Sequence, residues 1–84
     1  MKRQDVFKKL SEVFRDVFDD ESIVVTEVTS ADDIEDWDSL EHINLIVSVE
    51  KKFNMKFTMN EVVGMKNAGE MADVIMERGS EEGL

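Results

Sequence analysis

The sequence contains no cysteine and no proline, has a single histidine, and carries only half as many basic as acidic residues. Without cysteine, the chain can form no disulfide, no thiolate metal site and no cysteine nucleophile. Without proline, none of its helices is kinked by that residue. No apolar run approaches the roughly 20 residues of a membrane-spanning helix, and no apolar signal segment follows the first residues. We therefore expect a cytoplasmic chain without stable membrane insertion.

The length of 84 residues suits one small domain with one hydrophobic core. We expect a single domain over residues 1–84, with its core over about 4–78 and a flexible acidic tail over 79–84. We also expect this domain to be a monomer.

The charge is strongly negative and unevenly distributed. Twenty acidic and ten basic residues give a formal net charge of −10, and residues 16–50 include twelve acids but no lysine or arginine. We therefore exclude nucleic acid as a general partner, because phosphate binding requires basic patches. The acidic surface either keeps the chain in solution or complements basic patches on other proteins.

The first apolar pattern runs from Val6 to Phe18 with the three- and four-residue spacings of a helix. The β-branched stretch 23–28 has the composition of a strand, but no convincing partner strand exists for it. We therefore interpret residues 19–37 as a long connection that lays apolar side chains across a helical bundle.

Three later pairs have the three-residue spacing of a capping box: Asp38 with Glu41, Thr58 with Glu61, and more loosely Asn67 with Glu70. They predict helices over about 39–53, 59–64 and 68–78. Gly64 and Gly79 occupy positions where helices commonly end. Together these signals predict an all-α four-helix bundle with a long loop between the first two helices and a short third helix.

The helix predicted over 39–53 carries apolar residues on two nearly opposite sides. The side expected to face the core contains His42, Leu45, Ile46, Val49 and Phe53. The opposite side contains Leu40, Ile43 and Val47. Because a small amphipathic helix needs only one apolar stripe, the second stripe predicts either a partner-binding patch or scattered surface residues, and we favour the patch.

Ser39 is predicted to be the first residue of this helix, directly after its N-cap, Asp38. Backbone N–H groups and the helix dipole favour a phosphate group there, although Asp36 and Asp38 oppose one. The tripeptide Asp38-Ser39-Leu40 is common, so by itself it does not distinguish a phosphate-bearing serine from an ordinary helix start.

In its wider context, this tripeptide resembles the attachment helix of the acyl carrier protein family. The residues that match the family pattern are Asp38, Ser39, Leu40, Leu45, Glu50 and Phe53. The order of helices is also similar over about residues 4–78. The resemblance implies an acyl-carrier-type bundle in which a phosphopantetheinyl transferase moves 4'-phosphopantetheine from coenzyme A onto Ser39. The thiol of this arm would carry acyl groups as thioesters, so Ser39 would be an attachment site and the chain would not be an enzyme.

The resemblance also implies that acyl-loading and acyl-processing enzymes dock transiently through basic patches. The residues that would make this contact are Asp38, Leu40, Glu41, Ile43, Val47 and Glu50. The implied setting is fatty acid, polyketide or related lipid biosynthesis. No glycine shortly precedes Asp38, and Asn44, Lys51 and Lys52 stand where fatty-acid-synthesis carriers are usually acidic. These departures favour a specialised stand-alone carrier.

The family can also shelter an acyl chain between its helices. The residues that could line such a space are Leu45, Ile46, Val49, Phe53, Val62, Val63, Met71 and Ile75, which could equally form a plain core. Trp37 could pack against His42 as a hydrophobic staple or could flank the arm.

Two other functions stay open: an acidic protein-interaction module without the arm, and an aminoacyl or peptidyl carrier with a different cargo. We set aside a hydrolase, because Ser39 and His42 have no evident third partner or oxyanion hole. We also set aside a calcium loop and expect no dedicated metal site, because the acidic run over 32–38 lacks the required glycine.

Overall fold

The computed structural model describes residues 2–79, which form four helices and no strand. The helices are α1 (Arg3–Phe18), α2 (Ser39–Phe53), α3 (Met59–Gly64) and α4 (Ala68–Arg78). The predicted all-α fold, with its long first loop and short third helix, is confirmed. The tail that was expected to be flexible lies outside the described residues, apart from Gly79. None of the described helices is both long and apolar enough to cross a membrane.

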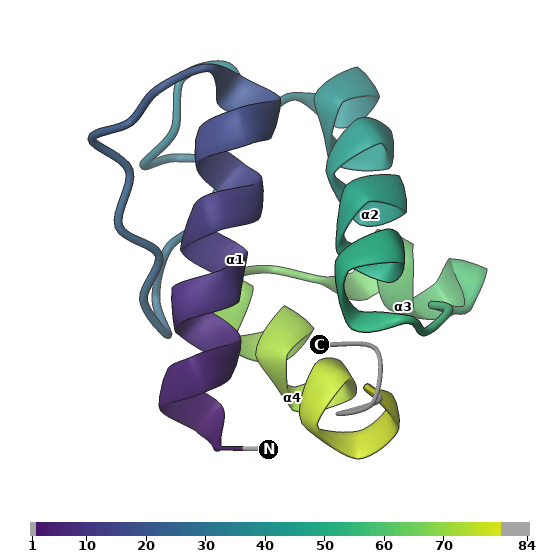
Figure 1. Cartoon of the computed structure of the whole chain (residues 1–84). Coiled ribbons are helices and arrows are strands. Elements are labelled where there is room, and N and C mark those ends of the chain that lie inside the picture. Colours follow the sequence, from purple (N-terminus) through teal and green to yellow (C-terminus); the bar gives the residue numbers. More distant parts are fainter. Residues whose placement is uncertain (1, 80–84) are drawn as a thin grey trace.

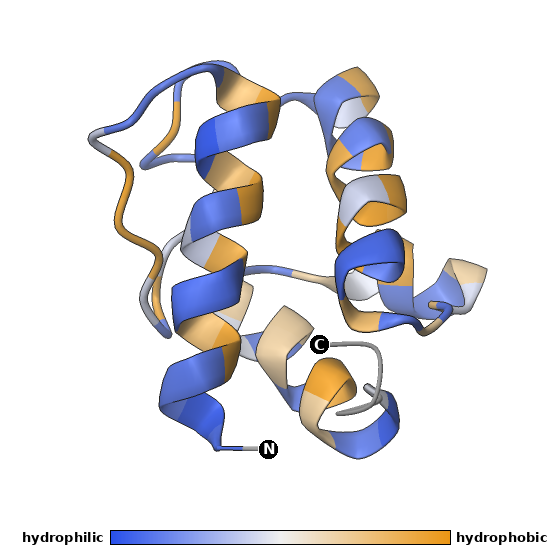
Figure 2. Cartoon of the chain, viewed as in Figure 1, coloured by the Kyte–Doolittle hydropathy of each residue, from blue (hydrophilic) through white to orange (hydrophobic). Residues whose placement is uncertain are grey.

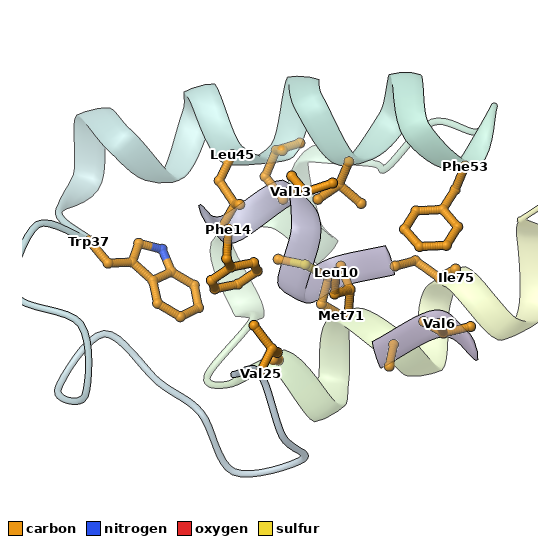
Figure 3. Close-up of a cluster of buried hydrophobic side chains, with 14 of the residues drawn as sticks. Val6, Leu10, Val13, Phe14, Val25, Trp37, Leu45, Phe53, Met71 and Ile75 are labelled. Atoms are coloured by element: carbon orange, nitrogen blue, oxygen red, sulfur yellow. The ribbon is translucent and has the colours of Figure 1, made fainter. Parts of the chain in front are cut away.

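Helices α1 and α2 lie side by side, and α4 packs against α1 near the amino-terminal end of the chain (Figure 1). The hydrophobic stripe of α1 faces α2, as its colouring in Figure 2 shows. Figure 3 shows the resulting core, in which Phe14 lies between Trp37 and side chains of the other helices. The rings of Phe14 and Trp37 meet edge to face, with centroids 5.1 Å apart, a favoured aromatic arrangement.

The left-handed residues that end α1 and α2 are not glycines. Asp19 and Asn54 have φ angles of 50° and 51°, and their backbone N–H groups donate to carbonyl groups in the last turns of these helices. Asp and Asn tolerate this conformation better than most residues. Gly64 and Gly79 do lie at the ends of α3 and α4 as predicted, but neither has a positive φ.

The long connection between α1 and α2 contains no strand, as predicted. Its residue Val25 is buried in the core, and the N–H of Val25 donates to Ser11 Oγ of α1 at 2.9 Å. This bond gives the otherwise buried hydroxyl of Ser11 a partner, which a polar group in a core requires. One apolar side chain therefore anchors the middle of the connection to α1.

Farther along, the connection is tied to the start of α4. Thr29 O accepts a hydrogen bond from Ala68 N at 2.7 Å, and Glu27 O accepts one from Gly69 N at 3.0 Å. These bonds satisfy two N–H groups that the first turn of a helix leaves unpaired. A Cβ atom at Gly69 would lie only 2.5 Å from Glu27 O, so the close approach requires glycine.

Arg3 of α1 reinforces the same junction. Its Nε donates to Glu27 Oε2 at 2.5 Å, its Nη2 donates to Gly69 O at 3.1 Å, and its Nη1 pairs with Asp73 Oδ1 at 2.9 Å. The hydrogen bond from Arg3 holds the pKa of the Glu27 carboxyl below its usual value, and that carboxylate in turn raises the pKa of Arg3. The loop and the starts of α1 and α4 therefore form one junction.

The short helix α3 is held mainly at its amino-terminal end. The predicted capping box is present: Thr58 N donates to Glu61 Oε1 at 2.8 Å, and Glu61 N donates to Thr58 Oγ1 at 3.3 Å. Arg78 of α4 pairs with Glu61 and donates to Lys56 O at 3.1 Å. Val62 is the residue of α3 that is buried in the core.

Candidate functional site

The candidate site lies where the long connection enters α2. Asp38 is the N-cap, as predicted, and its Oδ1 accepts a hydrogen bond from Glu41 N at 2.8 Å. The reciprocal bond of a full capping box is replaced here, because Glu41 Oε1 accepts from Asn44 Nδ2 at 3.4 Å. Ser39 is the first residue of the helix and is exposed. Its hydroxyl is therefore accessible beside the positive end of the α2 dipole.

The side chains of Trp37 and His42 contact each other close to Ser39, at the start of α2. The indole is only 9% exposed, and its Nε1–H donates to His42 Nδ1 at 3.0 Å. The two rings are stacked with centroids 5.9 Å apart. Of the two arrangements considered for Trp37, the packing against His42 is present, and the contact also contains a hydrogen bond that the sequence did not predict.

A groove of about 440 Å³ begins beside Ser39 and runs between α2 and α3. Side chains that line it include Trp37, His42, Ile43, Met59, Val62 and Val63. A larger hollow of about 760 Å³ lies in the long connection, between the end of α1 and residues 22–36. Cavity volume alone therefore does not identify the site, whereas the apolar lining and the exposed serine hydroxyl distinguish the smaller groove.

The two predicted faces of α2 are present. Leu45, Ile46, Val49 and Phe53 are buried. On the opposite side, Leu40, Ile43 and Val47 are 73%, 50% and 44% exposed, respectively. The second apolar stripe is therefore on the surface, and its residue Ile43 also lines the groove beside Ser39.

Helix α3 adds exposed apolar side chains that were not predicted from the sequence. Met59 and Val63 are 72% and 74% exposed, and both line the groove. They are four residues apart, a spacing that places two side chains on one helix face and could have indicated the patch. The expectation that Val63 lines an interior space was wrong, because its side chain is on the surface. The other seven residues expected there are buried.

Glu50 differs from its expected place on a docking surface. Its side chain is only 14% exposed, its Oε2 accepts from Phe57 N at 2.8 Å, and its Oε1 lies 3.9 Å from Lys56 Nζ. The carboxylate therefore fixes the turn between α2 and α3, and we leave Glu50 out of the docking surface. Asp38, Leu40, Glu41, Ile43 and Val47 remain.

The acidic run before α2 shows no metal-binding arrangement. Within residues 2–79, no group of three or more His, Asp or Glu side chains is placed to hold a metal ion. The run instead makes local bonds, such as those from Ser30 N to Asp33 Oδ2 at 3.0 Å and from Asp38 N to Asp36 O at 3.0 Å. The distinctive chemistry of the site is therefore one exposed serine hydroxyl, an acidic helix start and a neighbouring apolar groove.

The chain is similar to a solved structure whose function is described. No family model matches the chain, and no curated protein matches it. The solution NMR structure of a holo acyl carrier protein from Geobacter metallireducens matches with 48% sequence identity and a TM-score of 0.81. The match covers 87% of this chain and 84% of that one.

Proposed function

Because the chain belongs to the acyl carrier protein family, we propose that it carries acyl groups on a 4'-phosphopantetheine arm attached to Ser39. As a member of this family, the chain is a carrier and not an enzyme. The observation that carries the proposal is the exposed Ser39 within Asp38-Ser39-Leu40 at the first residue of α2. The similar carrier from Geobacter metallireducens is described as a holo protein, which supports an arm on this chain.

The residues around Ser39 fit this arm. The Ser39 hydroxyl is exposed, and the apolar groove beside it could accept the arm or its acyl cargo. In the modification, Ser39 Oγ forms a bond to the β-phosphorus of coenzyme A and its proton passes to a base of the transferase. The pyrophosphate bond breaks and 3',5'-ADP leaves. The bound arm supplies a thiol that holds acyl groups as thioesters.

The contribution of the chain itself is to fix the position of the serine. The Asp38 carboxylate accepts the Glu41 N–H, so α2 begins at Ser39 in a defined conformation. The first turn of α2 would then hold its backbone N–H groups and dipole close to a phosphate attached to Ser39. The buried Trp37 supports this turn from the core side, through its hydrogen bond to His42.

We propose that partner enzymes dock on the outward side of α2. Leu40, Ile43 and Val47 would provide a small apolar anchor, and Asp38 and Glu41 would attract basic patches on the partner. Charge attraction speeds such encounters, while a small apolar contact keeps them short-lived. The expected partners are a phosphopantetheinyl transferase with coenzyme A and the enzymes that load and process the acyl group.

The proposed setting is the synthesis of fatty acids, polyketides or related lipids in the cytoplasm, with the chain acting as a monomeric domain. The departures from the fatty-acid-synthesis pattern, above all Lys51 and Lys52, favour a specialised pathway. A partner that recognises a uniformly acidic α2 would meet these two lysines in the last turn of the helix.

The test is an intact-mass measurement after incubation with coenzyme A and a broad-specificity phosphopantetheinyl transferase. The wild type should gain one phosphopantetheine, Ser39→Ala should gain none, and Ser48→Ala on the same helix should behave like the wild type. Circular dichroism checks that each variant is folded. A folded wild type that gains nothing with two different transferases would contradict the proposal and favour the interaction module. A modified chain loaded only by aminoacyl-activating enzymes would indicate the aminoacyl or peptidyl carrier.

A further inference from the structure

A chain of two hydrogen bonds connects the start of α2 to α3. Trp37 Nε1 donates to His42 Nδ1 at 3.0 Å, and His42 Nε2 lies 3.0 Å from Val62 O. An indole N–H can only donate and a carbonyl oxygen can only accept. His42 must therefore accept at Nδ1 and donate from Nε2, which is the neutral imidazole with its hydrogen on Nε2.

The second of these bonds reaches a helix that has few other attachments. Helix α3 has six residues, and α4 holds its amino-terminal end through the ion pair between Arg78 and Glu61. Farther along, α3 itself is attached through the buried Val62 side chain and the bond between His42 and Val62 O, and Met65, directly after the helix, is half-buried against the core. At its last residue, Gly64, an added Cβ would meet no atom within 4 Å. His42 is therefore the polar connection from α2 to the carboxyl-terminal half of α3.

Protonation of His42 would place a hydrogen on Nδ1, which then could no longer accept from the indole. Two N–H donors would face each other across the contact between Trp37 and His42. Since Trp37 is almost entirely buried, its indole would have little access to water as a replacement acceptor. A buried donor without a partner is costly, so the cationic ring would be pushed out of this position.

We propose that Trp37, His42 and Val62 form a proton-sensitive latch, which holds α3 against the start of α2 when His42 is neutral and releases it when His42 is protonated. Histidine is the side chain that commonly changes charge between pH 5 and 8, and this chain contains only one. Because His42 and Val62 both line the groove beside Ser39, release of the latch alters that groove. The latch does not depend on whether Ser39 carries an arm.

The charged groups around the latch come from four segments: the long connection, α2, α3 and the connection between α3 and α4. They are Asp36 and Asp38 beside Trp37, Glu41 in α2, Glu61 in α3, and Lys66, which lines the same groove. Two of these carboxylates are engaged elsewhere: Asp38 caps α2, and Glu61 pairs with Arg78. The hydrogen bonds found for the His42 ring within the described residues go to Trp37 and Val62 alone. A protonated ring in its present place would thus gain no hydrogen-bonded carboxylate.

The test measures amide hydrogen exchange of residues 62–64 by NMR on the full chain at pH 7.5 and pH 5.5. The matched control is His42→Gln, because glutamine can accept from the indole and donate to Val62 O but does not titrate. Comparing the two proteins at each pH cancels the intrinsic dependence of exchange on pH. We expect α3 of the wild type to open about five- to tenfold more often, relative to the control, at pH 5.5 than at pH 7.5.

Two further measurements keep the test decisive if His42→Gln does not fold. Trp37→Phe removes the donor but keeps an aromatic ring, so the extra opening at pH 5.5 should disappear. Imidazole ¹⁵N shifts of the wild type at pH 8 should show the hydrogen on Nε2. A hydrogen on Nδ1 would overturn the proposal. An equal change with pH in the wild type and the glutamine variant would overturn it as well.

Discussion

The two sides of α2 are similarly apolar but have different surroundings. Leu45 and Val49 on the inward side are completely buried against α1 and the rest of the core. Leu40 and Val47 on the outward side are 73% and 44% exposed, respectively. Burial of a side chain of this size contributes about 1.5–3 kcal/mol to stability, and an exposed one contributes little. The inward side therefore holds the fold together, while the outward side is available for recognition.

The acidic residues of α2 show the same contrast. Glu50 accepts a hydrogen bond from Phe57 N and lies near Lys56, so its carboxylate is occupied within the chain. Glu41, nine residues earlier, has only a long contact of 3.4 Å to Asn44. Residue type and position on one helix therefore do not determine whether a carboxylate faces a partner. The deciding factor is whether another segment of the chain supplies a donor for it.

The largest expected difference is between Leu45→Ala and Val47→Ala. Removing the buried side chain of Leu45 leaves a cavity and should lower the free energy of unfolding by about 3–4 kcal/mol. Truncating Val47 on the surface should change it by less than about 0.5 kcal/mol. Urea unfolding followed by circular dichroism measures both values. A loss above about 2 kcal/mol for Val47→Ala would show that the outward side also supports the fold.

The same pair can be compared in the modification assay. Val47→Ala should slow attachment of phosphopantetheine while leaving the fold intact, because it shortens the proposed apolar anchor. The control is Val28→Ala, which truncates a valine on the long connection that is also exposed, at 75% compared with 44% for Val47. If both variants slowed modification to the same extent, the outward side of α2 would have no special part in docking.

A medium effect is expected at the two glycines of the helical region. Gly69→Ala forces a Cβ into Glu27 O and disrupts the bond between that oxygen and Gly69 N, which should cost about 1–3 kcal/mol. Gly64→Ala meets no neighbouring atom within 4 Å and should stabilise the chain by up to about 1 kcal/mol. Thermal unfolding of both variants checks the opposite signs. A stabilised Gly69→Ala would contradict the tight junction between the connection and α4.

The local features of this fold could be predicted from the sequence. Asp38, Thr58 and Asn67 each cap a helix, as their spacing to a following Glu indicated, because a cap depends on residues only three apart. The two faces of α2 could also be predicted, since fifteen residues give several full turns of the apolar pattern. The exposed serine at the start of α2 followed from the same cap.

The features that the sequence did not predict depend on contacts between segments. Glu50 accepts a hydrogen bond from Phe57 N because the chain reverses at Asn54, which has a left-handed backbone conformation. The sequence has no glycine at this position that would have indicated the reversal. Val63 belongs to a helix of six residues, which is too short for an apolar stripe to define an inward side. Gly69 is needed because Glu27, forty-two residues earlier, lies against it. Neither local propensity nor periodicity contains such information.

The smallest expected effect concerns the ion pair between Arg3 and Glu27. Like the outward side of α2, this pair is exposed to solvent. Like the inward side, it connects two segments of the chain. The hydrogen bond from Arg3 lowers the pKa of the Glu27 carboxyl in the folded chain. The stabilisation is therefore complete above the ordinary carboxyl pKa of about 4.3 and is lost as the pH falls through the lower folded value.

Glu27→Gln should accordingly lower the urea midpoint slightly at pH 7, and its difference from the wild type should shrink as the pH is lowered towards 2. Because the pair is solvent-exposed, added salt should reduce the difference at pH 7 as well. Glu77→Gln in the last turn of α4 is the control for removing an exposed acidic charge without removing this pair. A difference that stays constant from pH 7 to pH 2 would mean that Glu27 acts through packing. In that case, an exposed residue that contacts another segment would stabilise the fold through packing, as the inward side of α2 does. Exposure alone would then not distinguish residues that stabilise the fold from residues that are available for recognition.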